Sequence, residues 1–225
     1  MTERKGLGRK RHPDTPKAAQ LHAVSQVPRE AYDKPHRYWW QDGAWLDQGA
    51  TSTCVGHAFA HRRADATVRT AGITSPYAMK LYLDASGDTT YQEGTYAIEA
   101  CRVLMARGEI SQYNWCINPA ELQETLLQRG PVCVGTNWYE DMYDPEAKYG
   151  NQYLKVSGRI VGGHEYLING INTNPAEGPP FYRMKNSWGR GWGKSGTARI
   201  AMDDLHHLIF DEWGDAVLIK EVAHV

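Results

Sequence analysis

The stretch from Leu46 to Ala60 constrains the fold and chemistry of this chain more than any other segment. It places Gln48 six residues before Cys54 and follows the cysteine with small and apolar residues. This pattern predicts a helix that begins at Cys54, with Ser52 or Thr53 as its N-cap. Because the first turn of a helix carries unpaired backbone N–H groups, a thiolate is favoured there. Cys54 is therefore a candidate nucleophile, and the Gln48 amide could donate a hydrogen bond to an oxyanion.

A histidine and an asparagine further along the chain could complete a catalytic set. His164 follows two glycines and opens a predicted strand, and Asn186 ends another strand at a glycine-rich turn. A cysteine nucleophile needs a base within hydrogen-bond reach, and the base needs a partner that orients it. His164 is the candidate base, and the side-chain carbonyl of Asn186 could accept its second N–H. We expect the helix N-terminus and His164 to lower the Cys54 pKa from ~8.5 to well below about 7.

Three segments together resemble the papain family of cysteine peptidases: Leu46–Ala60, Gly162–Leu167 and Lys185–Gly193. The last one, Lys-Asn-Ser-Trp-Gly-Arg-Gly-Trp-Gly, is the most specific, and the resemblance covers roughly residues 27 to 222. It implies an α+β fold of two lobes, with a helical N-terminal lobe and an antiparallel, barrel-like β lobe. The order of elements along the chain favours the same class, because predicted helices come first and strands follow.

The resemblance also assigns roles to individual residues. It implies that Cys54 is the nucleophile, that His164 is the base and acid, and that Asn186 orients the histidine. Gln48 would be an oxyanion donor, and Trp188 would shield the histidine–asparagine contact from water. The residues expected to bind substrate are Ser52, Thr95, Tyr96, Gly163, Glu165 and Trp188.

Three positions depart from the family pattern. Val55 replaces a tryptophan that commonly follows the nucleophile, and Ser52 replaces a glycine beside the substrate channel. Glu165 stands where relatives usually carry a small residue. Its carboxylate either points into the substrate cleft and favours a basic side chain, or forms an internal ion pair, for example with Arg159 or Lys185.

Other histidines offer competing interpretations. Cys54, His57 and His61 share one face of the predicted helix and could ligate zinc, but no fourth ligand is evident at compact spacing. We therefore expect no metal or other cofactor, with His57 in the core between the lobes and His61 partly exposed. His206 and His207 follow two aspartates and predict a solvated surface turn.

The composition limits the class of protein and its partners. The chain has 225 residues with 41% hydrophobic and 23% charged residues, which suits one large domain or two small lobes. A net charge of −1 argues against nucleic-acid binding, and no apolar run is long enough to span a membrane. No secretory signal is evident, so we expect a cytoplasmic monomer that acts on a peptide or protein substrate. The four cysteines show no disulfide framework, and we expect Cys101 and Cys133 to be buried.

The local patterns divide the chain into an arm and a domain. Residues 1–26 are polar and basic, and the domain covers 27–225, with a helical lobe at roughly 50–128 and a β lobe at roughly 131–222. Helices are expected at 54–71, from Ser75, at 96–107 and from Asn118 to Gly130, each with a matching cap or stop signal. Strands are expected at 132–138, 160–161, 166–171, 182–186, 197–201 and 216–219.

The arm lacks helical periodicity and contains Pro13 and Pro16. We expect it to lie along the surface, with Arg9, Lys10 and Arg11 solvated or meeting acidic side chains. It is too short for a helical inhibitory domain, so its removal is not expected to raise activity.

These observations favour a cysteine endopeptidase that hydrolyses peptide bonds through a thioester acyl-enzyme. Two alternatives stay open. The same catalytic residues could serve a peptidoglycan endopeptidase, an amidase or an acyl transferase, and the fold could be a non-catalytic binding module.

Overall fold

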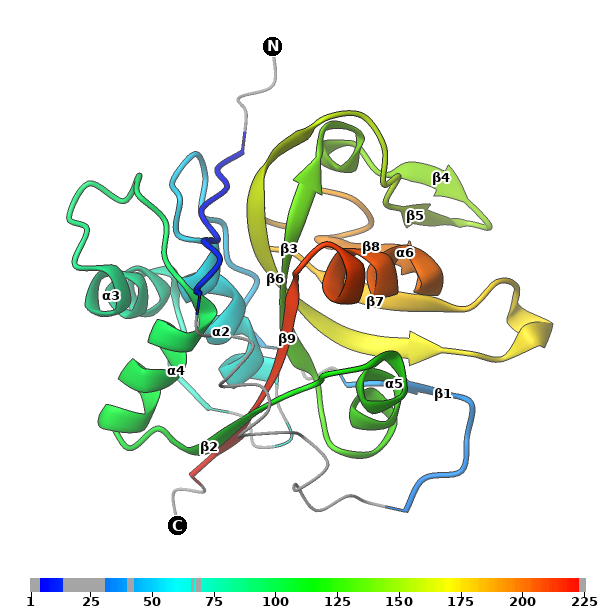
Figure 1. The fold of residues 1–225 in the computed structure, drawn as a ribbon, viewed down its shortest axis with the longest axis horizontal. Coiled ribbons are helices and arrows are strands. Elements are labelled where there is room, and N and C mark those ends of the chain that lie inside the picture. The colour runs from blue at the N-terminus through cyan, green and yellow to red at the C-terminus, as the bar shows by residue number, and fades with distance from the viewer. Residues whose placement is uncertain (1–4, 14–30, 40–42, 66, 68–69, 223–225) are drawn as a thin grey trace.

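The computed structural model describes residues 5–13, 31–39, 43–65, 67 and 70–222. Figure 1 shows helices and a large sheet in this part of the chain. The helices are α2 (Cys54–Asp65), α3 (Ser75–Ser86), α4 (Ala97–Ala106), α5 (Pro119–Gln128) and α6 (Met202–His206), and α6 continues into a π-helical turn, His207–Asp211. The strands are β1 (His36–Tyr38), β2 (Ile110–Trp115), β3 (Val132–Tyr139), β4 (Glu146–Lys148), β5 (Asn151–Tyr153), β6 (Ile160–Asn172), β7 (Phe181–Lys185), β8 (Thr197–Ala201) and β9 (Asp215–Glu221).

The strands form one sheet in the order β2-β9-β3-β6-β7-β8-β5-β4, and β1 also pairs with β6. Every pairing is antiparallel except the single β5–β8 contact. The α+β fold with helices before a mostly antiparallel sheet is therefore confirmed. The two short strands expected at 160–161 and 166–171 are parts of the single long strand β6.

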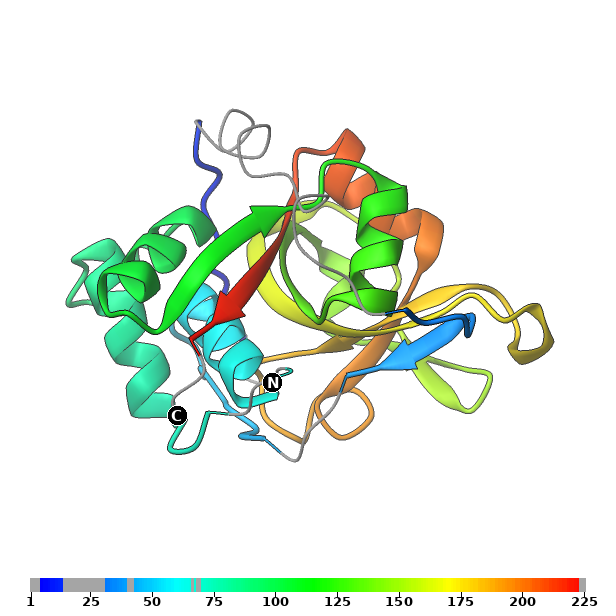
Figure 2. The ribbon, with the colours of Figure 1, turned by 90° about the horizontal axis from the view of Figure 1, so that it is seen from below.

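Both faces of the central strands are buried. Helices α2, α3 and α4 lie on one side of the sheet, and α5 and α6 lie on the other (Figures 1 and 2). On β3, Cys133 packs in the core shared with α2 and α4, whereas Val132 and Val134 pack in the core shared with α5. This explains why β3 is a continuous apolar run, which is typical of a strand covered on both faces.

The structure corrects several expected element boundaries. Helix α2 ends at Asp65 rather than at Ala71, and the buried Asp65 carboxylate accepts a hydrogen bond from Lys185 of β7 at 2.5 Å. Helix α3 is capped by Thr74, whose side chain accepts from the Tyr77 N–H, and not by Ser75. Helix α5 packs on the sheet core through Leu122 and Leu126.

A buried arginine joins the helical lobe to the sheet. Arg62 of α2 is 1% exposed and forms an ion pair with Glu221 of β9. It also donates to the carbonyl oxygens of Pro131 and Ile219, each at 2.8 Å. Because a buried charge needs a full set of partners, this arginine ties α2 to β9 and to the start of β3.

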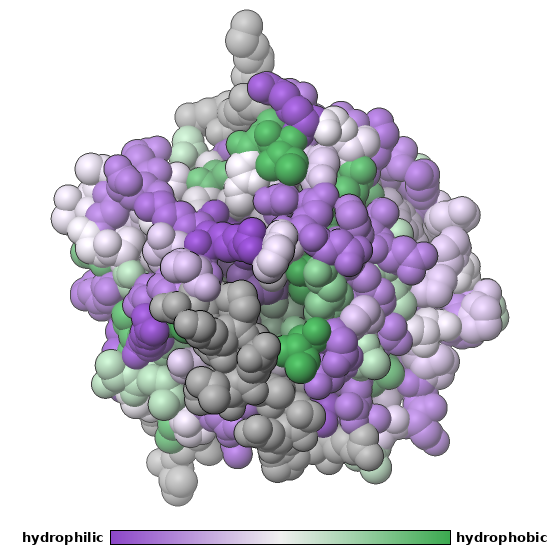
Figure 3. Space-filling model, in the orientation of Figure 1, coloured by the Kyte–Doolittle hydropathy of each residue, from purple (hydrophilic) through white to green (hydrophobic). Residues whose placement is uncertain are grey.

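The visible surface is mostly polar. In Figure 3 the coloured residues are predominantly hydrophilic, and the hydrophobic ones form small separate groups. Among the described residues, no helix is both long and apolar enough to cross a membrane. All four cysteines lie in the described part, where each is a buried free thiol.

Candidate active site

Cys54 is the first residue of α2 and is completely buried. The backbone of Glu165, which directly follows His164 on β6, lies within hydrogen-bonding range of the Cys54 thiol. The helical lobe and the sheet therefore meet at the cysteine, and the histidine-bearing strand passes beside it. Val55, Ala58 and Phe59 of α2 pack in one core with Leu167 of β6.

His164 is held by two different kinds of contact. Its Nε2 lies 2.8 Å from the Asn186 Oδ1, and this amide oxygen can accept the Nε2 proton. The Trp188 indole stacks on the imidazole with ring centroids 4.7 Å apart. The Trp138 ring meets the same imidazole edge-on at 4.8 Å. His164 Nδ1 has no hydrogen-bond partner among the described residues, so this nitrogen is the one that remains to exchange a proton.

Gln48 is fixed by contacts at both ends of its amide. Its Oε1 accepts a hydrogen bond from the Ser187 hydroxyl at 2.6 Å, and its Nε2 donates to the Thr51 carbonyl oxygen at 2.7 Å. The same Nε2 donates to the carbonyl oxygen of Gly6 at 3.1 Å. The amide N–H therefore points at a peptide carbonyl, as an oxyanion donor must. The loop carrying Gln48 is held in turn by a hydrogen bond from its backbone N–H to the Ser187 carbonyl oxygen at 2.9 Å.

Burial determines the protonation of the cysteine and the histidine. Burial raises the pKa of Cys54 to about 12, although the nearby backbone N–H groups of Glu165, Gly8 and Val55 favour the thiolate. Burial also lowers the pKa of His164 to about 4, although its hydrogen bond to Asn186 acts in the opposite direction. The neutral thiol and neutral imidazole are thus favoured at neutral pH. The expectation of a Cys54 pKa below 7 is wrong for this arrangement, because desolvation outweighs the helix N-terminus.

The described part of the N-terminal arm passes through this site, between the lobes rather than along the outside. Arg9 and Lys10 meet the acidic side chains of Asp215 and Glu93, which was one of the two arrangements expected. On the side of the helical lobe, the Gly6 N–H donates to the Gly49 carbonyl oxygen at 3.0 Å. On the side of the sheet, the Gly8 N–H donates to the Gly163 carbonyl oxygen at 3.1 Å. Figure 1 shows this segment in dark blue between α2–α4 and the strands β3 and β6. Pro16 and the rest of the arm from residue 14 lie outside the described residues.

Most of the residues expected to bind substrate contact the arm. Thr95 donates its N–H to the Gly8 carbonyl oxygen at 2.8 Å and accepts from the Lys10 N–H at 2.7 Å. Gly163 accepts from the N–H groups of Gly8 and Arg9. The Tyr96 ring contacts His12 edge-on at 4.9 Å.

Ser52 forms part of the same wall. A Cβ on Gly8 would lie 1.9 Å from its carbonyl oxygen. Trp188 differs from this group, because it covers the His164 ring.

Glu165 lies beside the buried Arg9 of the arm, and neither ion-pair partner considered from the sequence contacts it. Lys185 pairs with Asp65, and Arg159 pairs with Glu140. Burial and the negative charge of Asp215 raise the pKa of Glu165 well above its ordinary value, and Arg9 opposes this shift.

His57, His61 and His206 each have a hydrogen-bond contact of their own. His57 is buried with its Nδ1 3.0 Å from the Thr53 carbonyl oxygen. His61 is also buried and accepts from the Leu46 N–H at 3.0 Å, so the expectation that it is partly exposed is wrong. In the described ranges, no group of three or more His, Cys, Asp or Glu side chains is placed to hold a metal ion. His206 lies on α6 and shares a hydrogen bond of 2.7 Å with the Tyr182 hydroxyl, so it is not part of a solvated turn.

Three residues of the site were missed from the sequence. Ser187 orients the Gln48 amide, and its signal was present in the Asn-Ser-Trp-Gly run. Gly135 interrupts the apolar strand β3, and a glycine inside a strand is a sign that other groups approach closely. Asp215 carried no local signal, because its role depends on the pairing of β9 with β3.

The comparisons with known proteins point to one family. The sequence profile of papain family cysteine proteases matches residues 46–211. A gut-specific cysteine proteinase of Caenorhabditis elegans is 35% identical over 95 residues, which cover 42% of this chain and 27% of that protein. A cathepsin B-like cysteine proteinase of Ostertagia ostertagi is 33% identical over 90 residues, which cover 40% of this chain and 49% of that protein. The matched regions thus span less than half the length of these relatives.

Solved structures share the whole fold. Xylellain, a cysteine protease from Xylella fastidiosa, has a TM-score of 0.72 over 99% of both chains at 17% identity. A procathepsin B from Trypanosoma congolense has a TM-score of 0.69 over 97% of this chain and 87% of that one, at 13% identity. The fold is a two-lobed chain in which Cys54 begins α2, and the His164–Asn186 hydrogen bond lies on the sheet against which α2 packs. The chain belongs to the papain family of cysteine proteases, because the family profile matches well over half of its length.

Proposed function

We propose that this chain is a cysteine endopeptidase that cleaves peptide bonds through a thioester on Cys54. The observation that carries the proposal is the contact between Gln48 and Gly6, in which a peptide carbonyl oxygen accepts the Gln48 Nε2–H at 3.1 Å. An extended peptide backbone therefore fits between the lobes with its carbonyl directed at the proposed oxyanion donor.

The catalytic cycle follows from the atoms that remain available. His164 Nδ1 takes the Cys54 thiol proton, and the sulfur attacks the carbonyl carbon of the substrate. The negative oxygen is stabilised by the Gln48 Nε2–H and the Cys54 backbone N–H. His164 gives its proton to the leaving amine, and a thioester remains. Water then attacks the thioester while His164 accepts a proton, and collapse of this second intermediate restores the thiol and releases the acid.

Asn186 and Trp188 act through His164. The Asn186 Oδ1 at 2.8 Å fixes the ring so that Nε2 carries the proton and Nδ1 faces the reaction. Trp188 is 2% exposed, and it keeps water from this hydrogen bond. A cavity of about 660 Å³ lies beside Trp188 and Trp192 at the Lys5 end of the arm, where it gives room for part of a bound substrate.

The proposal is tested by peptide hydrolysis with single variants. A peptide library is incubated with the full chain and with a Gly8→Ala variant, in which the added methyl group would lie 1.9 Å from the Ser52 carbonyl oxygen and so displace the arm. We expect cleavage that is abolished by Cys54→Ala and reduced by orders of magnitude by His164→Ala. Cys116→Ala is the matched control, since Cys116 is also a buried thiol and its Sγ contacts the Thr125 hydroxyl of α5. Undiminished cleavage by a folded Cys54→Ala protein would refute the proposal.

A further inference from the structure

A second cavity, of about 450 Å³, lies against the strands β5, β7 and β8. Its lining includes four basic side chains, Arg183, Arg190, Lys194 and Arg199, and none of its described lining residues is acidic. We call it the basic cavity. Binding sites for small molecules usually have volumes of about 300–1,000 Å³. The basic cavity is therefore large enough for a small molecule, and its charge favours an anion.

Two of the four cations come from directly opposed positions of the sheet. Arg183 of β7 and Arg199 of β8 are register partners, so their side chains leave the same face side by side. Like charges in such a pair are destabilising. Burial lowers the pKa of Arg183 and the charge of Arg199 acts in the same direction, whereas Asp65 and Tyr38 oppose both. Because Asp65 already pairs with Lys185 at 2.5 Å, an added anion would reduce the repulsion between the two arginines.

Neutral groups hold two of the basic side chains in place without cancelling their charge. The Lys194 Nζ donates to the Gly150 carbonyl oxygen at 2.8 Å. The Arg199 guanidinium lies 3.9 Å from the centroid of the Phe181 ring, and its Nη1 donates to the Tyr153 hydroxyl at 3.3 Å. Within the described ranges, neither side chain has a carboxylate at ion-pair distance. Both cations are therefore positioned for a ligand but not neutralised.

Arg190 adds a third cation from the glycine-rich turn that follows Trp188. Its side chain is exposed, and its guanidinium lies 5.0 Å from the centroid of the Trp45 ring. Trp45 also lines the basic cavity. A Cβ on Gly196 would lie 2.6 Å from this ring, so the indole is tightly packed. The fixed indole keeps the Arg190 charge at the wall of the cavity.

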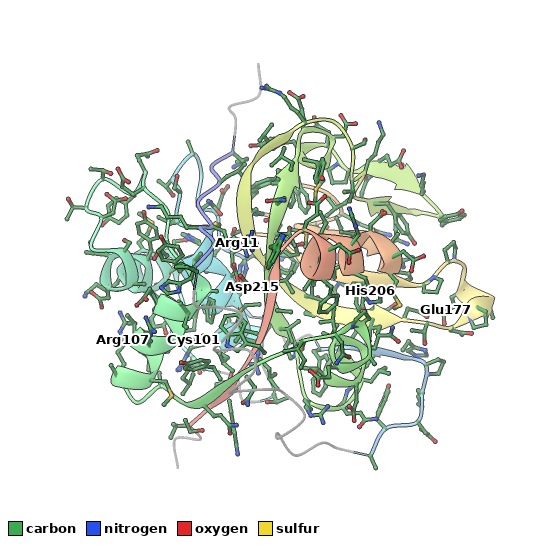
Figure 4. All side chains as sticks on the ribbon, viewed as in Figure 1. Arg11, Cys101, Arg107, Glu177, His206 and Asp215 are labelled. Carbon is green, nitrogen blue, oxygen red and sulfur yellow. The ribbon has the colours of Figure 1, made fainter. Side chains whose placement is uncertain are left out.

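Acidic side chains of neighbouring elements have partners elsewhere. Glu146 of β4 forms an ion pair with Lys148. Glu177 accepts hydrogen bonds from the side chains of Asn172 at 2.6 Å and Asn174 at 3.2 Å. Figure 4 labels Glu177 at the end of the hairpin that joins β6 to β7. Because neither carboxylate is among the described lining residues, the charge of the basic cavity is left to an anion from solution.

Phosphate groups suit this arrangement better than a single carboxylate. A guanidinium presents a planar fork of N–H donors that matches phosphate oxygens, and an ammonium binds phosphate as a point charge. One phosphate group carries a charge of about −1.5 to −2, so two linked groups supply about the charge that Arg190, Lys194 and Arg199 call for. The net charge of −1 for the whole chain argues against a long polyanion.

We propose that the basic cavity is a binding site for a small anion that carries two linked phosphate groups. Arg199 and Lys194 bind the phosphates at the sheet, and Arg190 binds them from the turn. Neither Cys54 nor His164 lines this cavity, so the inference does not depend on the proposed function.

The first test measures which anion binds. The full chain is titrated calorimetrically with inorganic pyrophosphate, inorganic phosphate and citrate, each at an ionic strength of about 0.15 M, where attraction to exposed charges is screened. Pyrophosphate should bind about tenfold or more tightly than either of the other two anions. Citrate that binds as tightly as pyrophosphate would overturn the assignment to phosphate groups. Absence of pyrophosphate binding would overturn the site itself.

The second test locates the site with matched variants. Lys194→Gln and Arg199→Gln should each weaken pyrophosphate binding by about ten- to hundredfold, as for the loss of a hydrogen bond between charged groups. Lys194 is exposed, so its variant carries the test if Arg199→Gln does not fold. Arg102→Gln is the control, because Arg102 is an exposed cation of α4 that pairs with Glu99 and does not line the cavity.

Thermal denaturation gives a second readout of the same variants. Because a ligand that binds the folded chain stabilises it, pyrophosphate should raise the Tm of the parent and of Arg102→Gln more than that of Lys194→Gln. Parent-like affinity and Tm shift in Lys194→Gln would overturn the inference. An equal loss of affinity in Arg102→Gln would also overturn it, since pyrophosphate would then respond only to the total charge of the chain.

Discussion

Removing the Gln48 side chain should lower kcat far more than it lowers stability. The Nε2–H of Gln48 points at a peptide carbonyl at 3.1 Å, which is the distance expected of an oxyanion donor. Loss of one such donor costs about 10²–10³ in kcat, or about 2.7–4 kcal/mol of transition-state stabilisation. Gln48→Ala should therefore reduce kcat by this factor.

Ser187→Ala provides the matched comparison. It removes the hydroxyl that donates to the Gln48 Oε1 at 2.6 Å but leaves the amide donor in place. One hydrogen bond contributes about 0.5–1.5 kcal/mol net, which corresponds to about a two- to tenfold loss in kcat through a less fixed amide.

The assay measures kcat at a saturating peptide concentration, with Gln48→Ala and Ser187→Ala each made in the Gly8→Ala background. This background separates the two roles of Gln48, because the amide otherwise also holds the arm through Gly6. A folded Gln48→Ala enzyme with a kcat within about threefold of its parent would refute the oxyanion assignment. A Ser187→Ala loss equal to that of Gln48→Ala would show that Ser187 does more than orient the amide.

Two further predictions concern stability. Burial lowers the pKa of His57 to about 4 and that of His61 well below its ordinary value. The unfolded chain therefore binds protons below about pH 6.5 that the folded chain does not, and the free energy of unfolding falls as the pH falls. The loss is about 1.4 kcal/mol per pH unit for each imidazole that stays neutral in the folded chain. Urea denaturation between pH 7.5 and 5.5 should show a shallower acid loss for His57→Phe than for the parent, and identical slopes would contradict the burial argument. Arg62→Ala should lower the unfolding free energy by about 3–5 kcal/mol because it leaves Glu221 buried without its cation. Adding Glu221→Leu should recover part of the loss. An unchanged urea midpoint for Arg62→Ala alone would contradict a stabilising role of the Arg62–Glu221 ion pair.

Short local sequence patterns were enough to predict the candidate residues of the site. Cys54 was placed at a helix start by the residues around it, and the structure begins α2 there. His164 lies on β6 and Asn186 directly follows β7, and the two are within hydrogen-bond distance.

Features that depend on packing between distant segments could not be predicted in this way. The end of α2 at Asp65 depends on Lys185, 120 residues away. The burial of His61 depends on a hydrogen bond from the Leu46 N–H, which no helical periodicity reveals. The pKa of Cys54 was expected to be lowered by the helix N-terminus and His164, whereas burial raises it.

The arm was misjudged for a related reason. Its described residues, 5–13, form neither a helix nor a strand, and its lack of helical periodicity therefore predicted a surface segment. Its only local signals are Gly6 and Gly8, where a Cβ would lie 2.0 Å from the Thr51 carbonyl oxygen and 1.9 Å from that of Ser52. Alternate glycines in an otherwise basic segment indicate close backbone contact, but they do not identify the surface that is contacted.

The central claim is that Cys54 is the nucleophile of a site that the arm covers. The most direct measurement is labelling with a thiol-directed epoxysuccinyl probe, followed by peptide mapping by mass spectrometry, in the parent and in Gly8→Ala. The account predicts an adduct on Cys54 alone, formed slowly in the parent and faster in Gly8→Ala. Equal labelling of Cys54 and the other cysteines, or a Cys54 that stays unlabelled in both proteins, would contradict it.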